Sequence, residues 1–140
     1  MSNVAIIGAG YVGLTTAACL AHIGHNVTCA DIDENKISQL NDGEIPIHEA
    51  RLPELVQEGL SNQLLKFVVG AKRAITASEF VFLCLPTPQG EDGRADIGAV
   101  LDVVEEIRQL VLPQTIIINK STVPIGTIAA IETAIQREDV

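Results

Sequence analysis

Three glycines near the amino terminus have a spacing that suits phosphate binding. They form the pattern G-x-G-x-x-G in Gly8-Ala9-Gly10-Tyr11-Val12-Gly13. Gly8 would allow a tight turn, Gly10 would let a pyrophosphate approach the backbone, and Gly13 would permit close packing of a helix on a strand. The pyrophosphate would then lie at a helix amino terminus, where unpaired N–H groups carry partial positive charge. By itself the pattern is weak, because glycine-rich turns often only connect two elements.

A carboxylate further along the chain strengthens this interpretation. Asp31 ends the expected strand 26–31 and stands 18 residues after Gly13, where a carboxylate can accept hydrogen bonds from the hydroxyls of an adenosine ribose. The alternative is a surface acid at the end of a strand. Asp31 would also repel a 2'-phosphate, and no Arg follows it, so the sequence favours NAD over NADP.

The elements that must position these residues alternate between strand and helix. We expect strands over 4–7, 26–31, 65–69, 80–85 and 115–119, and helices over 11–23, 34–40, 52–60, 97–111 and 125–136. This alternation is typical of an α/β fold with a doubly wound parallel sheet, the Rossmann fold. The apolar run 80–85 favours a central strand. A sixth strand would come after Val140, so we expect residues 1–140 to be one NAD-binding Rossmann domain of a longer enzyme.

The amino-acid composition disfavours several classes of binding partner. The net charge of -9 argues against nucleic acid or an anionic membrane surface. No apolar run is long enough to span a bilayer and no basic leader is visible, so we expect a soluble cytoplasmic protein. Cys19, Cys29 and Cys84 are odd in number and stand in apolar stretches, which favours free thiols. Cys19 and His25 each lie three residues from His22, but without a second ligand cluster we predict no metal site.

Five segments together resemble the UDP-glucose and GDP-mannose dehydrogenase family. The glycine segment 8–14 resembles the opening of that family, and four later segments agree with it in order and spacing: 30–37, 43–49, 86–96 and 120–127. The segment Ile45 to Glu49 is most like the UDP-glucose enzymes. Two residues depart from the family pattern, because Arg51 stands where a Pro-Gly turn is usual and Pro86 stands where a small residue is common.

The resemblance implies an NAD-dependent oxidoreductase. Such an enzyme oxidises the C6 alcohol of UDP-glucose to the carboxylate of UDP-glucuronate with two NAD, through a thioester on a cysteine. That cysteine belongs to a later domain of the family and has no counterpart here. We therefore expect the chain alone to bind NAD without turnover, and to meet a nucleotide sugar only together with further domains. The whole enzyme would be a homo-oligomer.

Other functions stay open at this point. A dehydrogenase acting on UDP-N-acetylmannosamine or GDP-mannose would share most of these motifs. A dehydrogenase of the 6-phosphogluconate type is disfavoured by the segments around Ile45 and Thr122. A chain of this length could also be a stand-alone nucleotide-binding regulatory module.

The family's cofactor contacts carry over to residues that match its motifs. By this resemblance Tyr11 and Val12 contact the phosphates, Asp31 and Lys36 the adenosine end, and Thr87 and Thr122 the nicotinamide end. Thr122 would also position the water of the hydrolytic step. The residues alone also allow another interpretation, in which Lys36 is a charge on a helix surface and Thr122 is a helix cap beside Pro124.

Overall fold

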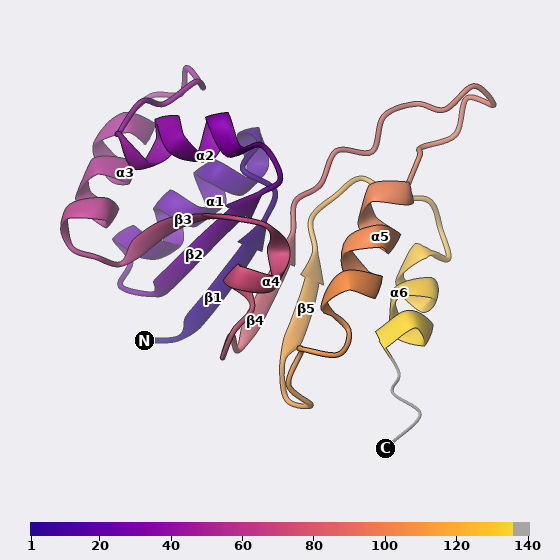
Figure 1. The fold of residues 1–140 in the computed structure, drawn as a ribbon. Coiled ribbons are helices and arrows are strands. Elements are labelled where there is room, and N and C mark those ends of the chain that lie inside the picture. Colours follow the sequence, from indigo (N-terminus) through magenta and orange to yellow (C-terminus); the bar gives the residue numbers. More distant parts are fainter. Residues whose placement is uncertain (136–140) are drawn as a thin grey trace.

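The computed structural model describes residues 1–135, which form a five-stranded parallel sheet with helices on both faces (Figure 1). The strands lie side by side in the order β3-β2-β1-β4-β5, and their bounds are β1 (Asn3–Ile7), β2 (Asn26–Asp31), β3 (Leu65–Val69), β4 (Phe80–Leu83) and β5 (Ile116–Asn119). The order reverses between β1 and β4. The doubly wound α/β fold is therefore confirmed, with the switch point at which such sheets bind ligands.

The helices divide between the two faces of the sheet. They are α1 (Tyr11–His22), α2 (Glu34–Asn41), α3 (Leu52–Ser61), α4 (Ala71–Ala74), α5 (Gly98–Ile107) and α6 (Thr127–Ile135). Figure 1 shows α1, α2 and α3 on one side, and α4, α5 and α6 on the other. No helix among residues 1–135 is long and apolar enough to cross a membrane.

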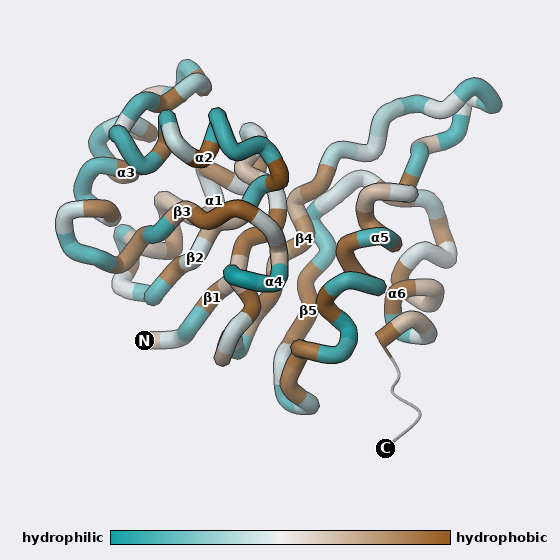
Figure 2. Tube along the Cα trace, viewed as in Figure 1, coloured by the Kyte–Doolittle hydropathy of each residue, from teal (hydrophilic) through white to brown (hydrophobic). Residues whose placement is uncertain are grey.

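Each face of the sheet has its own hydrophobic core. Alternate residues of β1 supply both, because Val4 and Ile6 face the α1 side while Ala5 and Ile7 face the α5 side. Hydrophobic residues follow the strands in Figure 2, and hydrophilic ones cover α4 and the tip of the loop between β4 and α5. Burial on both faces explains the unbroken apolar run of residues 4–7 in β1.

The middle of the sheet belongs to β1 rather than to β4. The strand β4 is nevertheless an inner strand, paired with β1 and with β5, as the apolar run 80–85 predicts. The side chains of Phe80 and Phe82 are only half-buried, whereas Val4 to Ile7 are buried throughout. On the face that carries Phe80 and Phe82, α1, α2 and α3 pack mainly on β1, β2 and β3. Hydrophobicity therefore predicts an inner strand correctly, but it does not predict that β1 is buried more deeply than β4.

Several boundaries differ from those expected. β4 ends at Leu83 because the N–H of Leu85 donates to the Ser121 side chain instead of a strand. α5 is shorter than 97–111, and α6 begins at Thr127 because Gly126 takes a positive φ of 96°. The expected end of that helix, Gln136, lies outside the described residues. The four-residue helix α4 is too short for a periodic pattern and was not expected.

Candidate dinucleotide-binding site

The carboxyl ends of β1, β2, β4 and β5 open into a pocket of about 900 Å³. It is lined by eight of the nine residues selected from the sequence: Gly8, Gly10, Tyr11, Val12, Asp31, Lys36, Thr87 and Thr122. The ninth, Gly13, is buried beneath the turn and contacts Gly8 instead of the pocket. The fold thus brings together residues from the glycine turn, the end of β2 and the loops after β4 and β5, which are far apart in the chain.

The glycine turn is built as its spacing predicts. Gly8 has a φ of 104°, and a Cβ there would lie 2.3 Å from the carbonyl oxygen of Cys84. A Cβ on Gly13 would lie 1.7 Å from the carbonyl oxygen of Gly8, so only glycine lets α1 approach β1 this closely. A Cβ on Gly10 would meet no atom within 4 Å, which leaves open space above the turn. The amino terminus of α1 faces that space, and its first N–H groups have no partner within the helix.

Asp31 is held by three donors at the end of β2. Its Oδ2 accepts hydrogen bonds from the Ala9 N–H at 2.9 Å and from Lys36 Nζ at 3.0 Å, and its Oδ1 accepts one from the Asp33 N–H at 3.1 Å. Burial raises the pKa of the Asp31 carboxyl, but these donors outweigh that effect and hold the pKa below its ordinary value. Asp31 is therefore a carboxylate at neutral pH, and Lys36 partly compensates its charge.

Tyr11 joins the glycine turn to the loop that precedes α3. Its hydroxyl donates a hydrogen bond to Glu49, and the nearby carboxylate raises the pKa of the Tyr11 phenol. Arg51 follows in this loop with a φ of 64°, a left-handed conformation that a glycine adopts more readily. The departure of Arg51 from the family pattern thus falls at a strained turn.

Thr87 and Thr122 join the loops that follow β4 and β5. The Thr87 hydroxyl donates to the carbonyl oxygen of Thr122 at 2.6 Å. Beside them, Ser121 Oγ accepts from the Leu85 N–H at 2.9 Å and donates to the Leu83 carbonyl at 3.3 Å. The helix α6 begins only at Thr127, after Gly126, so Thr122 is not the cap of that helix. The sequence missed Ser121 as a lining residue, although its place just after a strand is a signal.

Residues of α4 and α5 complete the pocket and were also missed. They include Ala71, Ala99, Asp102, Val103 and Glu106. Cys84 lies beneath the turn, and burial raises the pKa of its thiol to about 11. Cys84 is therefore protonated at neutral pH and is a poor nucleophile.

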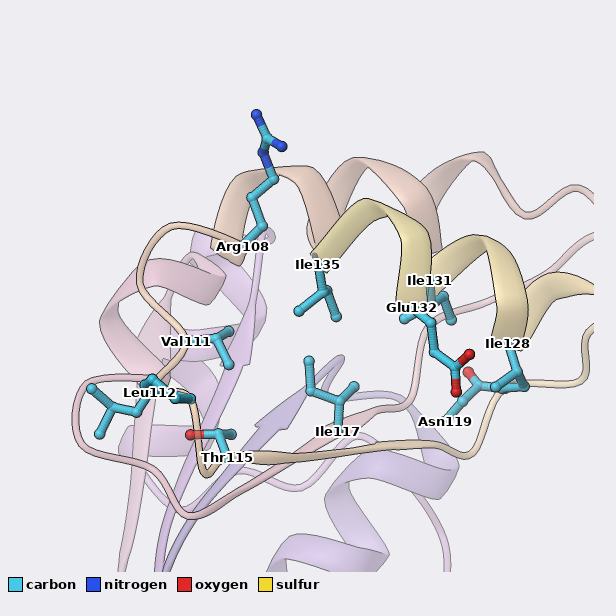
Figure 3. Close-up of a pocket in the computed structure, with 11 residues that line it drawn as sticks. Arg108, Val111, Leu112, Thr115, Ile117, Asn119, Ile128, Ile131, Glu132 and Ile135 are labelled. Carbon is cyan, nitrogen blue, oxygen red and sulfur yellow. The ribbon is translucent and has the colours of Figure 1, made fainter. Parts of the chain in front are cut away.

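A second hollow of about 650 Å³ lies between β5 and α6. Its walls are mainly apolar, and Figure 3 shows Ile117 and Ile135 pointing toward one another while Arg108 points away. The hollow lacks the glycine turn and the convergent hydrogen-bonding groups of the first pocket, so it fits a dinucleotide poorly. In residues 1–135 no group of three or more His, Cys, Asp or Glu side chains is arranged to hold a metal ion.

Comparison with known families decides the class of this protein. Residues 2–140 match the NAD binding domain of the UDP-glucose/GDP-mannose dehydrogenase family. The chain belongs to this family. It is 39% identical over 137 residues to a UDP-glucose 6-dehydrogenase from Bacillus subtilis and 40% identical over 134 residues to one from Pseudomonas aeruginosa. These matches cover 98% and 96% of the chain but only 30% of each relative, so the chain spans about a third of their length.

Solved structures of nucleotide-sugar dehydrogenases have the same fold. A GDP-mannose dehydrogenase from Pseudomonas aeruginosa, solved as a ternary complex, matches with a TM-score of 0.85 and 32% identity, over 94% of this chain and 32% of that one. A UDP-glucose dehydrogenase from Pyrobaculum islandicum matches with a TM-score of 0.83 and 30% identity, over 96% and 33%. The pocket therefore lies in the NAD-binding domain that is common to this family.

Proposed function

We propose that this chain is the NAD-binding part of an enzyme that oxidises the C6 alcohol of UDP-glucose to the carboxylate of UDP-glucuronate with two NAD. The choice of sugar is supported by the identities of 39% and 40% to two UDP-glucose 6-dehydrogenases, over 98% and 96% of the chain.

The observation that carries the proposal is the open space above Gly10 at the amino end of α1, with Asp31 at the neighbouring strand end. A pyrophosphate fits that space because no Cβ fills it and helix N–H groups face it. The N–H groups of Tyr11 and Val12 would hold the phosphates. Asp31 Oδ1 accepts only one hydrogen bond within the described residues and retains capacity for a ribose hydroxyl.

Lys36 keeps the Asp31 carboxylate ionised and oriented, so its role at the adenosine end is one of positioning as well as contact.

At the other end of the pocket, Thr87 fixes the backbone of Thr122. The Thr122 hydroxyl has no hydrogen-bond partner in the part of the chain that the structure describes, and it is exposed. That hydroxyl is free to orient a water for the hydrolytic step. NAD, when bound, supplies the acceptor of the hydride.

We further propose that the chain alone binds NAD but does not oxidise the sugar. A thioester needs an accessible thiolate, whereas Cys29 and Cys84 are buried thiols whose pKa values are raised by burial. Cys19 is exposed but does not line the pocket. Without a positioned nucleophile, covalent catalysis and the rate gain from proximity are both lost.

The test combines a binding titration with an activity assay on the purified chain. Calorimetry should show NAD binding, while NADH absorbance should stay flat with NAD and UDP-glucose. Turnover would overturn the claim that the chain lacks a nucleophile. A folded chain that does not bind NAD would overturn the cofactor site.

A domain exchange tests the sugar. In the Bacillus subtilis UDP-glucose 6-dehydrogenase, this chain would replace the matched 137 residues. The chimera should oxidise UDP-glucose with NAD, and Asp31→Ala in the same chimera should raise the KM for NAD. The matched control is the same exchange in the GDP-mannose dehydrogenase, which should give the weaker enzyme. The reverse ranking would contradict the choice of UDP-glucose.

A further inference from the structure

One side of α5 forms a wall of the dinucleotide pocket. Ala99, Asp102, Val103 and Glu106 all line it, and their spacing of three, four and seven residues puts them on one helical stripe. The adjoining stripe, which includes Val100, Val104 and Ile107, is buried in the core. That burial fixes the rotation of α5, so the wall is held in place before any ligand arrives.

The two carboxylates of this wall are free acceptors. Within residues 1–135, neither Asp102 nor Glu106 makes an ion pair or a side-chain hydrogen bond, whereas the neighbouring Glu105 pairs with Arg108 at 3.0 Å. The Asp31 carboxylate differs, because Lys36 and two backbone N–H groups already occupy most of it. The wall therefore presents two exposed carboxylates, without partners in residues 1–135, to the pocket.

The adenine base would lie at this wall if the dinucleotide binds as proposed above. Asp31 holds the ribose and α1 holds the phosphates, so the base must extend from the ribose away from α1. The pocket there is bounded by Ile32 after β2, Ala71 of α4 and the stripe of α5. The Ile32 side chain is 85% exposed and Val103 is half-buried, so both offer apolar surface for the flat faces of a base.

We infer that Asp102 and Glu106 select the base of the cofactor by accepting a hydrogen bond from its 6-amino group. Adenine donates at this position, and a carboxylate is the stronger kind of acceptor. A 6-oxo purine such as hypoxanthine presents lone pairs instead, which would face the negative charge of the wall. The inference rests on the proposed NAD site, and it adds a specificity that the glycine turn and Asp31 do not provide.

The experiment compares NAD with nicotinamide hypoxanthine dinucleotide by titration calorimetry on the full chain. The two ligands differ at position 6 of the purine, where an amino donor is replaced by a carbonyl oxygen, and at N1, which carries a hydrogen only in hypoxanthine. We expect NAD to bind about tenfold more tightly, the size of one hydrogen bond to a charged group. In the double variant Asp102→Ala/Glu106→Ala, NAD affinity should fall to that of the hypoxanthine compound. Alanine favours helix, so α5 should persist, and circular dichroism checks this.

The matched control is Glu105→Ala, which removes the neighbouring carboxylate that does not line the pocket. It should keep the full preference for NAD. Equal affinities of the two ligands for the unmodified chain would overturn the inference, as would a preference that survives in the double variant. Failure of the unmodified chain to bind either ligand would instead overturn the proposed cofactor site, so the two failures are distinguishable.

Discussion

The glycines at positions 10 and 13 should respond in opposite ways to the same small change. We consider Gly10→Ala and Gly13→Ala, each of which adds one methyl group. At Gly13 the new Cβ would lie 1.7 Å from the carbonyl oxygen of Gly8 and 2.9 Å from its carbonyl carbon. Both are backbone atoms, so α1 must move away from β1. At Gly10 no atom lies within 4 Å and φ is -79°, an ordinary value for any residue.

The expected magnitudes follow from these contacts. Overpacking of a core costs about 1 to 3 kcal/mol, and a clash with backbone belongs at the upper end or beyond. Alanine returns about 1 kcal/mol of helix propensity at Gly13, which leaves a net loss of about 2 kcal/mol or more. Gly10→Ala should change the free energy of unfolding by about 1 kcal/mol at most, because only the cap and chain-entropy terms change. Its methyl group instead enters the space proposed for the pyrophosphate.

Urea unfolding followed by far-UV circular dichroism measures both variants, since the chain has no Trp and one Tyr for fluorescence. With a slope of about 2 kcal/mol per molar urea, Gly13→Ala should lower the midpoint by about 1 M. Gly10→Ala should keep its midpoint and lose about tenfold or more in NAD affinity. An unchanged midpoint for Gly13→Ala, or full NAD affinity for Gly10→Ala, would refute the division of roles between these glycines.

Three further predictions concern the residues around the turn. NAD should bind more tightly than NADP by about 1 to 4 kcal/mol, because the Asp31 carboxylate would repel the 2'-phosphate of NADP. The variant Lys36→Met should increase this difference in affinity, because it removes a positive charge beside the phosphate. Equal affinities of NAD and NADP in a titration would contradict the role of Asp31. Tyr11→Phe and Glu49→Gln should each weaken NAD binding, because each breaks the same hydrogen bond between Tyr11 and Glu49. The double variant should bind NAD no more weakly than the single variant with the lower affinity, whereas strictly additive losses of binding free energy would contradict a shared contact. The pKa of Asp31 in the folded chain lies below its ordinary value of 3.8. The folded chain should therefore be more stable than the variant Asp31→Asn at a pH above 3.8, and this difference in the free energy of unfolding should be lost as the pH falls through the folded pKa. Urea midpoints at pH 7 and at about pH 3 check this, and an equal difference at both would count against it.

Much of the fold and of the site could be predicted from local sequence. The bounds of β2 and β3 agree with the expected segments because both are rich in apolar and β-branched residues and lie close to a glycine, Gly24 before β2 and Gly70 after β3. Asp31 and the glycine turn were predictable for the same reason, since each residue acts within its own strand–turn–helix unit. The family resemblance added Thr87 and Thr122, which no periodic pattern would have selected.

Other features depend on residues that are distant in sequence, so only the tertiary structure decided them. The deeper burial of β1 than of β4 follows from which strands the helices cover, not from the hydrophobicity of the strand. The pairing of Tyr11 with Glu49 joins positions 38 residues apart, and no local pattern encodes it. The stripe of α5 that carries Asp102 and Glu106 is, by its charges alone, typical of a solvated helix face. It borders the pocket because the packing of α5 on the core fixes its rotation, and such packing depends on the whole chain at once.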